Sequence, residues 1–198
     1  MVQVNSFWND ALKYGAIVGL VMGLSRIYET WAMFTGEDVG IGFVFVAEWI
    51  LSVVAYVWML FKFSRLRASH CDPKEGFTFG RAWSFSMMLI ILAAIIVGVM
   101  YHIYITIVGY DSFVAGYMSL MDKYEAMIQS VGMPSTYGRL FDDMREAMRN
   151  STAPTMFDNI VSSVYNYLTL GAVLSLAVAA TVRREPKYTP NEDDSYGA

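Results

Sequence analysis

The stretch from residue 82 to residue 108, AWSFSMMLIILAAIIVGVMYHIYITIV, contains no Asp, Glu, Lys or Arg. A helix rises by about 1.5 Å per residue, so this stretch is long enough to cross a hydrocarbon core of about 30 Å. Three further apolar stretches exceed the roughly 20 residues that a crossing needs, at residues 11–34, 41–63 and 155–182. Because 56% of the 198 residues are hydrophobic and 16% are charged, the sequence predicts an all-α polytopic membrane protein with four transmembrane helices.

Lysine and arginine predict the orientation of these spans. The connection between the second and third spans holds Lys62, Arg65, Arg67, Lys74 and Arg81, and the fourth span is followed by RREPK at 183–187. The short connection between the first two spans, at 35–40, is acidic and has no base. The positive-inside rule therefore places both termini and the middle connection in the cytoplasm.

The segment at 111–150, between the third and fourth spans, then lies outside. Apolar residues recur in it at three- and four-residue steps, which predicts a pair of amphipathic helices on the periplasmic side. Residues 185–198 are polar and read as a disordered cytoplasmic tail, so residues 1–184 form a single membrane-embedded bundle.

Several polar residues lie within the predicted spans, where an ionisable group normally has a partner or a purpose. The candidate intramembrane polar cluster consists of Arg26, Glu29, Glu48, His102, Asn159, Ser162, Ser163 and Asn166. Counting helical rise from the span ends puts these residues at a similar depth in the outer half. A short turn joins the first two spans, so we expect Arg26 and Glu48 to form an ion pair. Glu29, one turn outward of Arg26, could join this pair or reach the interface.

Small residues share faces with these polar groups and predict where helices pack closely. Gly15, Gly19 and Gly23 are four residues apart in the first span, and Ala94 and Gly98 precede His102 at the same spacing in the third. Small residues allow helix backbones to approach in a membrane. We therefore expect the polar groups to face neighbouring helices and not lipid.

A structural reading of the cluster competes with a functional one. An Arg–Glu pair with a hydrogen-bonded histidine often serves only to clasp helices together, and two of these charges can neutralise each other. The alternative is a pathway or a ligand site. The sequence contains no complete catalytic motif and no His/Cys/Asp/Glu grouping typical of a metal site, so no catalytic residue, metal or cofactor is expected.

The order of several short motifs resembles the small Bacteroidota membrane proteins grouped as the DUF4199 family. The motifs are LKYG at 12–15, FTFGRAW at 77–83, YHIY at 101–104, GM at 132–133 and APT at 153–155. The resemblance covers most of the chain and implies a four-helix protein of a Gram-negative inner membrane. It implies no activity and supplies no functional residues.

Three functions from different classes fit these observations. The leading hypothesis is a non-enzymatic accessory or scaffold subunit of an inner-membrane assembly, in contact with the lipid bilayer and with a membrane-protein partner or further copies of itself. The second is a small carrier or channel for a proton, ion or lipid-like molecule that uses the polar cluster. The third is a lipid-modifying enzyme with His102 and Glu48 as acid and base. A water-filled cleft reaching the cluster would favour the second and third, and a dry, fully paired cluster would favour the first. Nothing in the sequence supports binding of nucleic acid.

Overall fold

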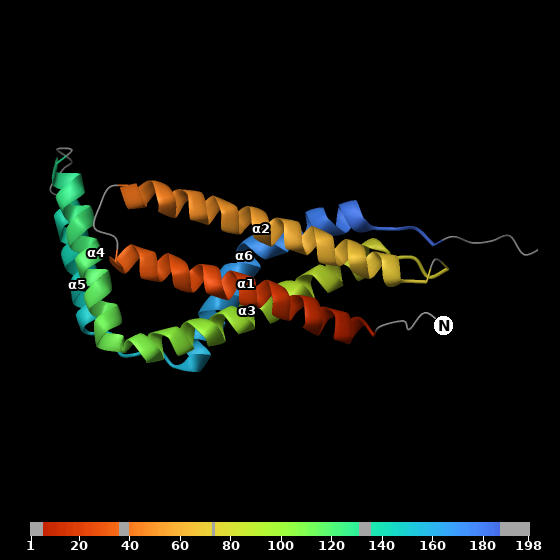
Figure 1. Ribbon diagram of the computed structural model, residues 1–198, viewed down its shortest axis with the longest axis horizontal. Helices are drawn as coiled ribbons and strands as arrows, with labels where there is room; N and C mark the ends of the chain where they lie inside the picture. Colours follow the sequence, from red (N-terminus) through yellow and green to blue (C-terminus); the bar gives the residue numbers. More distant parts are fainter. Residues whose placement is uncertain (1–5, 36–39, 73, 131–135, 187–198) are drawn as a thin grey trace, which may run out of the picture.

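The computed structural model describes residues 6–35, 40–72, 74–130 and 136–186. All the regular secondary structure in these residues is helical, in six helices (Figure 1). They are α1 (Phe7–Thr35), α2 (Gly40–His70), α3 (Phe79–Val108), α4 (Tyr110–Ser130), α5 (Thr136–Arg149) and α6 (Met156–Val182). The acidic connection at 36–39, the motif at 132–133 and residues 187–198 of the predicted tail lie outside the described residues.

Four helices run lengthwise and the other two cross one end of them. In Figure 1, α1, α2, α3 and α6 lie along the long axis, and α4 and α5 form a hairpin across it. The chain turns from α3 into α4 at Gly109, whose φ of 84° suits a residue without a side chain. Its N–H closes the last turn of α3 by donating to the carbonyl of Ile105.

The hairpin packs on the end of α1 through aromatic side chains. The ring of Phe34 lies edge-on to Phe113 and Tyr117, with centroids 5.5 and 5.2 Å apart, and it sits directly over Gly116. Burial raises the pKa of the Tyr117 phenol to about 12. Arg145 on α5 bonds Glu125 and Asp122 on α4, and these hydrogen bonds raise the pKa of its guanidinium.

The core of the bundle is the contact of α3 with α1 and α6. Phe85, Leu89 and Ile90 of α3 are completely buried. The α1 glycines all face α3, and a Cβ added at Gly15 or Gly19 would come within 2.8 Å of a side-chain carbon of Leu92 or Ile96. The small residues therefore lie where two helix backbones approach closely, as van der Waals packing between membrane helices requires.

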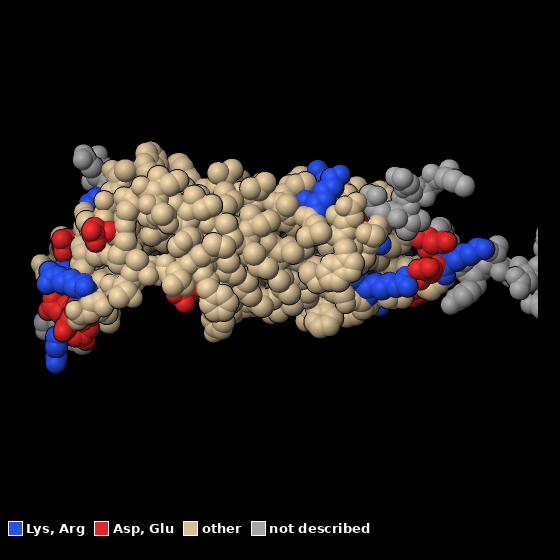
Figure 2. Space-filling view, turned by 90° about the horizontal axis from the view of Figure 1, so that it is seen from below, with Lys and Arg blue, Asp and Glu red and all other residues tan. Residues whose placement is uncertain are grey.

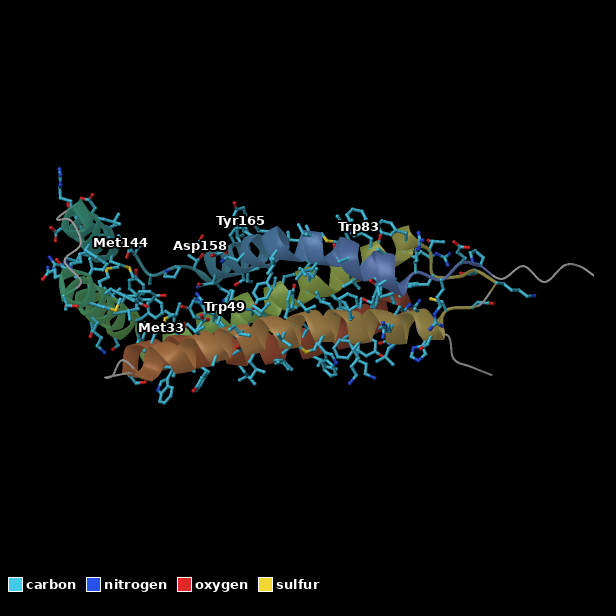
Figure 3. The ribbon with its side chains drawn as sticks, turned by 90° about the horizontal axis from the view of Figure 1, so that it is seen from above. Met33, Trp49, Trp83, Met144, Asp158 and Tyr165 are labelled. Carbon is cyan, nitrogen blue, oxygen red and sulfur yellow. The ribbon has the colours of Figure 1, made fainter. Side chains whose placement is uncertain are left out.

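The outside of the bundle is apolar along its length. Side chains such as Leu24, Leu51 and Val173 are more than 60% exposed, and Trp83 and Tyr165 point outwards (Figure 3). On the face in Figure 2, charged side chains gather towards the two ends and leave the middle largely uncharged. An apolar surface of this extent is typical of a protein surrounded by lipid.

Three helices among the described residues are long and apolar enough to cross a membrane. They are Val46–His70, Phe79–Val108 and Met156–Val182. Helix α1, which covers the predicted first span, is not in this set, although it packs against two of the three, α2 and α3 (Figure 1). Its charged residues lower its hydropathy, and one of them, Asp10, is completely buried inside the protein.

The helix that contains the predicted second span, residues 41–63, extends beyond the end of that span. Helix α2 continues to His70, so Lys62, Arg65 and Arg67 lie on its last turns and not in a loop. Only a short connection remains before α3. Phe77 in this connection pairs with Arg184 beyond α6 through two backbone hydrogen bonds of 2.9 Å, which ties the chain together at this end.

Candidate functional site

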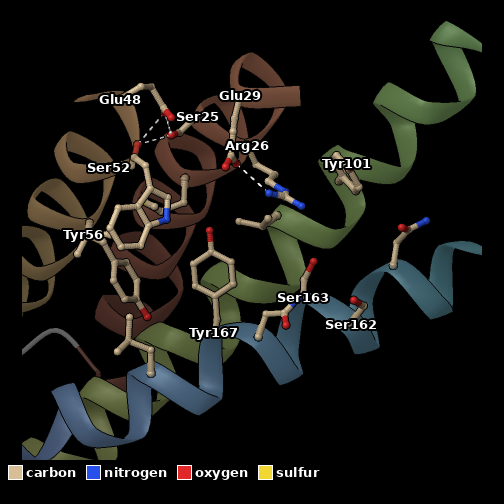
Figure 4. Close-up of a pocket in the computed structure, with 17 residues that line it drawn as sticks. Ser25, Arg26, Glu29, Glu48, Ser52, Tyr56, Tyr101, Ser162, Ser163 and Tyr167 are labelled. Carbon is tan, nitrogen blue, oxygen red and sulfur yellow. Dashed lines mark hydrogen bonds and ion pairs between the residues drawn. The ribbon is translucent and has the colours of Figure 1, made fainter. Parts of the chain in front are cut away.

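A cavity of about 340 Å³ opens between α1, α2, α3 and α6, towards the end that carries the α4–α5 hairpin (Figure 4). Its walls combine polar and apolar side chains. They are Met22, Ser25, Arg26, Glu29, Glu48, Trp49, Ser52, Val53, Tyr56, Val97, Tyr101, Asn159, Ser162, Ser163, Asn166, Tyr167 and Leu170. We call this the polar cavity. It brings together seven of the eight residues of the candidate cluster.

On the α1 wall, Arg26 is held by a residue one turn further along its own helix. Its Nη1 donates to Oε2 of Glu29 at 2.8 Å. The guanidinium also lies 5.4 Å from the ring centre of Tyr101 on α3, within the range of a cation–π contact. The Arg26 side chain remains 43% exposed, so part of its donor capacity still faces open space.

On the opposite wall, Glu48 of α2 is bonded to hydroxyl groups. Its Oε1 accepts from Ser25 Oγ at 2.5 Å and from Ser52 Oγ at 2.8 Å, and the two hydroxyl oxygens are 2.5 Å apart (Figure 4). Ser52 is one turn along α2 from Glu48, and Ser25 reaches across from α1. The three oxygens form a compact triangle on the cavity wall.

The expected ion pair between Arg26 and Glu48 is therefore replaced by two separate arrangements within the described helices. Glu29 follows Arg26 at i+3, where side chains on one helix face meet, so the pair forms without any contact between helices. Glu48 instead bonds the two serine hydroxyls. Glu29, which could join Arg26 by its position one turn along the helix, bonds it, and no bond between Arg26 and Glu48 is present among the described residues.

The polar side chains on the α6 wall are the most accessible to a ligand. Ser162 and Asn166 are exposed and Ser163 is half-buried, and the described residues provide no hydrogen-bond partner for these three side chains. The first turn of α6 is fixed by a capping box, in which Thr155 and Asp158 bond each other's backbone N–H groups. That cap fixes where the polar face of α6 begins.

His102 lies apart from the residues that line the cavity. Asn159 bridges it to α6: its Nδ2 donates to the carbonyl of Thr155 at 3.2 Å and lies 3.2 Å from His102 Nδ1. The first bond identifies Nδ2 as the amide NH₂, so the ring nitrogen must accept and carries no proton in this arrangement. Gly98, one turn before His102, lies directly against Asn159 and Ile160, where a Cβ would be 2.6 Å from Ile160 Cα. Ala94 is completely buried at the preceding turn.

The predicted cluster did not include the three tyrosines that line the polar cavity, Tyr56, Tyr101 and Tyr167. The rings of Tyr56 and Tyr167 meet edge to face at 5.6 Å, and Tyr167 directs its hydroxyl towards the Arg26–Glu29 pair (Figure 4). The hydroxyl of Tyr56 is buried and has no hydrogen-bond partner among the described residues. Tyr56 is two turns along α2 from Glu48, through Ser52, and this i, i+4, i+8 spacing was the signal available in the sequence.

A second polar site at the other end of the bundle was also missed. Arg67 Nη1 on α2 donates to Asp10 Oδ2 on α1 at 2.8 Å, and the Asp10 side chain is completely buried. Nδ1 of His70 lies 4.0 Å from the same carboxylate oxygen. Nearby, Ser64 and Ser86 bond each other in the core at 3.1 Å. We call Asp10 and Arg67 the buried clasp.

The polar cavity combines hydrogen-bonding groups with apolar surface. The described residues contain no group of three or more His, Cys, Asp or Glu side chains that could hold a metal ion. The cavity offers carboxylates, a guanidinium, hydroxyls and amides on one side, and Met22, Val97 and Leu170 on another. Such a surface suits a molecule with a polar and an apolar part.

Comparison with known families assigns this chain to one of them. The profile of one family, described as "Protein of unknown function (DUF4199)", matches residues 13–184. The chain belongs to the DUF4199 family. The match includes the polar cavity and Arg67 of the buried clasp, while Asp10 precedes the matched region. No curated protein and no solved structure matches the chain.

Proposed function

We propose that this DUF4199 protein is a small membrane carrier that binds a lipid-like molecule or a small polar molecule in the polar cavity. The observation that carries the proposal is a cavity of about 340 Å³ with polar walls inside helices whose outside is apolar. That volume lies within the usual range of ligand pockets, roughly 300–1,000 Å³. Ser162, Ser163 and Asn166 line it with no hydrogen-bond partner among the described residues, and polar groups at membrane depth mark substrate pathways.

The membrane arrangement belongs to the same proposal. We place the protein in a bacterial inner membrane with α1 as a fourth span, both termini cytoplasmic and the α4–α5 hairpin periplasmic. Helix α1 supports this because it is similar in length to the three apolar helices, packs against α2 and α3 and exposes Leu20 and Leu24 outwards. The basic residues at the end of α2, before α3 and after α6 support the orientation.

The accessory-subunit hypothesis receives less support from this site. That hypothesis expects a dry, fully paired cluster, whereas part of the polar cavity is lined by groups that have no partner among the described residues. An acid–base enzyme that uses Glu48 and His102 also receives little support. His102 is not among the cavity-lining residues and bonds Asn159 instead.

The topology can be tested with single cysteines and a membrane-impermeant maleimide. The native Cys71, between α2 and α3, should react only after lysis. In a Cys71→Ser background, Ser130→Cys at the exposed end of α4 should react in intact spheroplasts. The reverse pattern would overturn the orientation.

Ligand binding can be tested by filling the cavity. Ser163→Phe adds a ring to the α6 wall, and Val161→Phe adds a ring to the exposed, lipid-facing side of the same helix. After purification in a mild detergent, native mass spectrometry should detect bound lipid or small molecules on the parent protein and on Val161→Phe, and several-fold less on Ser163→Phe. Equal retention by all three folded proteins would overturn the carrier proposal.

A further inference from the structure

The charges on the walls of the polar cavity do not balance. Three of the described lining residues are charged, namely Arg26, Glu29 and Glu48. Arg26 is paired with Glu29 at 2.8 Å. The carboxylate of Glu48 is bonded to hydroxyls alone. The cavity therefore has one negative charge for which its walls provide no cation.

The polar atoms beside Glu48 are oxygens, and each of them can accept a hydrogen bond from a ligand. The oxygens of Ser25, Ser52 and the carboxylate lie within 2.5–2.8 Å of one another, and hydroxyl hydrogens rotate to suit a ligand. Tyr56, one turn beyond Ser52 on α2, lines the same cavity, but its hydroxyl points away from these three oxygens, towards Gly171 of α6 (Figure 4). A primary ammonium group has three N–H donors and a positive charge, so it matches this wall in charge and in donor number.

The rest of the cavity argues for an amphiphile as the bearer of that cation. Met22, Val53 and Leu170 supply apolar surface beside the polar wall. Leu170 is exposed on α6, so the apolar part of the cavity continues into the outer surface of the bundle. A ligand could place its headgroup at Glu48 and its hydrocarbon against this apolar surface.

We propose that Glu48, together with the hydroxyls of Ser25 and Ser52, binds the cationic group of the cavity's ligand, the primary ammonium of an aminolipid headgroup. The inference rests on the proposed carrier function and adds the chemical class of the ligand. The same three oxygens could receive a bare monovalent cation, so the experiment has one arm for each source of positive charge.

The lipid arm uses full-length protein in nanodiscs of equal phosphatidylethanolamine and phosphatidylglycerol with identical acyl chains. Native mass spectrometry after extraction measures the ratio of the two retained lipids. We expect about a tenfold preference for the amine lipid. One charge-assisted hydrogen bond to Glu48 should raise the binding affinity by about that factor. Glu48→Gln should bring the ratio close to one. Glu75→Gln, the same change at an exposed residue of the α2–α3 connection, should retain the preference.

The cation arm compares the unfolding temperature of delipidated protein in sodium chloride and in choline chloride at equal ionic strength. If sodium stabilises the parent protein but not Glu48→Gln, the three oxygens form a cation site and the cation that they bind is sodium. If Glu48→Gln does not fold, the double variant Ser25→Ala/Ser52→Ala replaces it, and an unchanged lipid ratio and sodium response there would overturn the site.

The two proposals fail in different ways. Lipid retention that Ser163→Phe abolishes, without an amine preference or a sodium effect, would leave the carrier function standing and overturn the cation site. Retention that Ser163→Phe does not change would overturn the carrier function. In that case the sodium response alone would decide whether Glu48 binds a cation.

Discussion

The two ends of the helix bundle use similar side chains in opposite ways. At one end, Asp10 and Arg67 form the buried clasp, with the carboxylate completely enclosed and the guanidinium bonded to it across two helices. In the polar cavity, Arg26 is bonded along its own helix and Glu48 is bonded to hydroxyls, beside open space. The charges of the buried clasp bond each other and join α1 to α2, whereas polar groups of the cavity remain able to bind a ligand.

This difference predicts that stability is concentrated at the clasp. Removing one partner of a buried ion pair costs about 3–5 kcal/mol in soluble proteins, because the other charge stays buried without compensation. We expect Asp10→Ala or Arg67→Ala to lower the free energy of unfolding in detergent by an amount of this order. The double variant should lose less than the sum of the two single losses. Additive losses in denaturant titrations would show that the two residues act independently and would remove the contrast with the cavity.

The next largest effect should come from the packing behind the cavity. An alanine at Gly98 would place its Cβ 2.6 Å from Ile160 Cα and 2.9 Å from the carbonyl of Asn159, both backbone atoms. Helix α6 must then move away from α3, at a cost of about 1–3 kcal/mol for overpacking. Gly138→Ala on α5 is the matched control, since a Cβ there meets nothing within 4 Å and removing a helical glycine is neutral or slightly stabilising.

Thermal unfolding of both glycine variants measures this difference. A Gly98→Ala protein as stable as the Gly138→Ala protein would show that the α3–α6 contact is looser than the structure indicates. The same measurement repeated on Ser163→Phe would separate damage to the helix contact from filling of the cavity.

The charges of the polar cavity should contribute little to stability. Double-mutant cycles between Arg26 and Glu29 should give a coupling of roughly 0.2–1 kcal/mol, the range of partly exposed ion pairs. Cycles between Arg26 and Glu48 should give a smaller value, since the two side chains have different partners. A coupling between Arg26 and Glu48 as large as that of the clasp would mean that they form the ion pair expected from the sequence.

The sequence predicted the helical class, three of the membrane spans and seven of the residues that line the cavity, because these follow from hydropathy and from the depth of each residue along its helix. The pairing within the cavity did not follow. Glu29 competes for Arg26 from the next turn of the same helix, and serine hydroxyls compete for Glu48. Both alternatives depend on side-chain rotamers that spacing alone does not determine.

The buried clasp was missed for a different reason. Asp10 precedes the predicted first span, and Arg67 follows the predicted end of the second span, so neither was a candidate for the intramembrane polar cluster. The continuation of α2 to His70 turns Arg67 towards α1 and allows it to reach a completely buried carboxylate. A helix end that extends past its apolar stretch therefore changes the role of the residues on it.

The smallest effect should come from His102, which adjoins the cavity without lining it. Its Nδ1 accepts from the amide of Asn159, and a glutamine side-chain oxygen could accept the same bond. A single hydrogen bond contributes about 0.5–1.5 kcal/mol, so His102→Gln should cost no more than the lower end of that range, and His102→Leu should cost more. Lipid retention should be unchanged in His102→Gln if the residue only positions α6. If His102→Gln folds normally and still loses the bound lipid, the boundary of the cavity must be redrawn to include the imidazole.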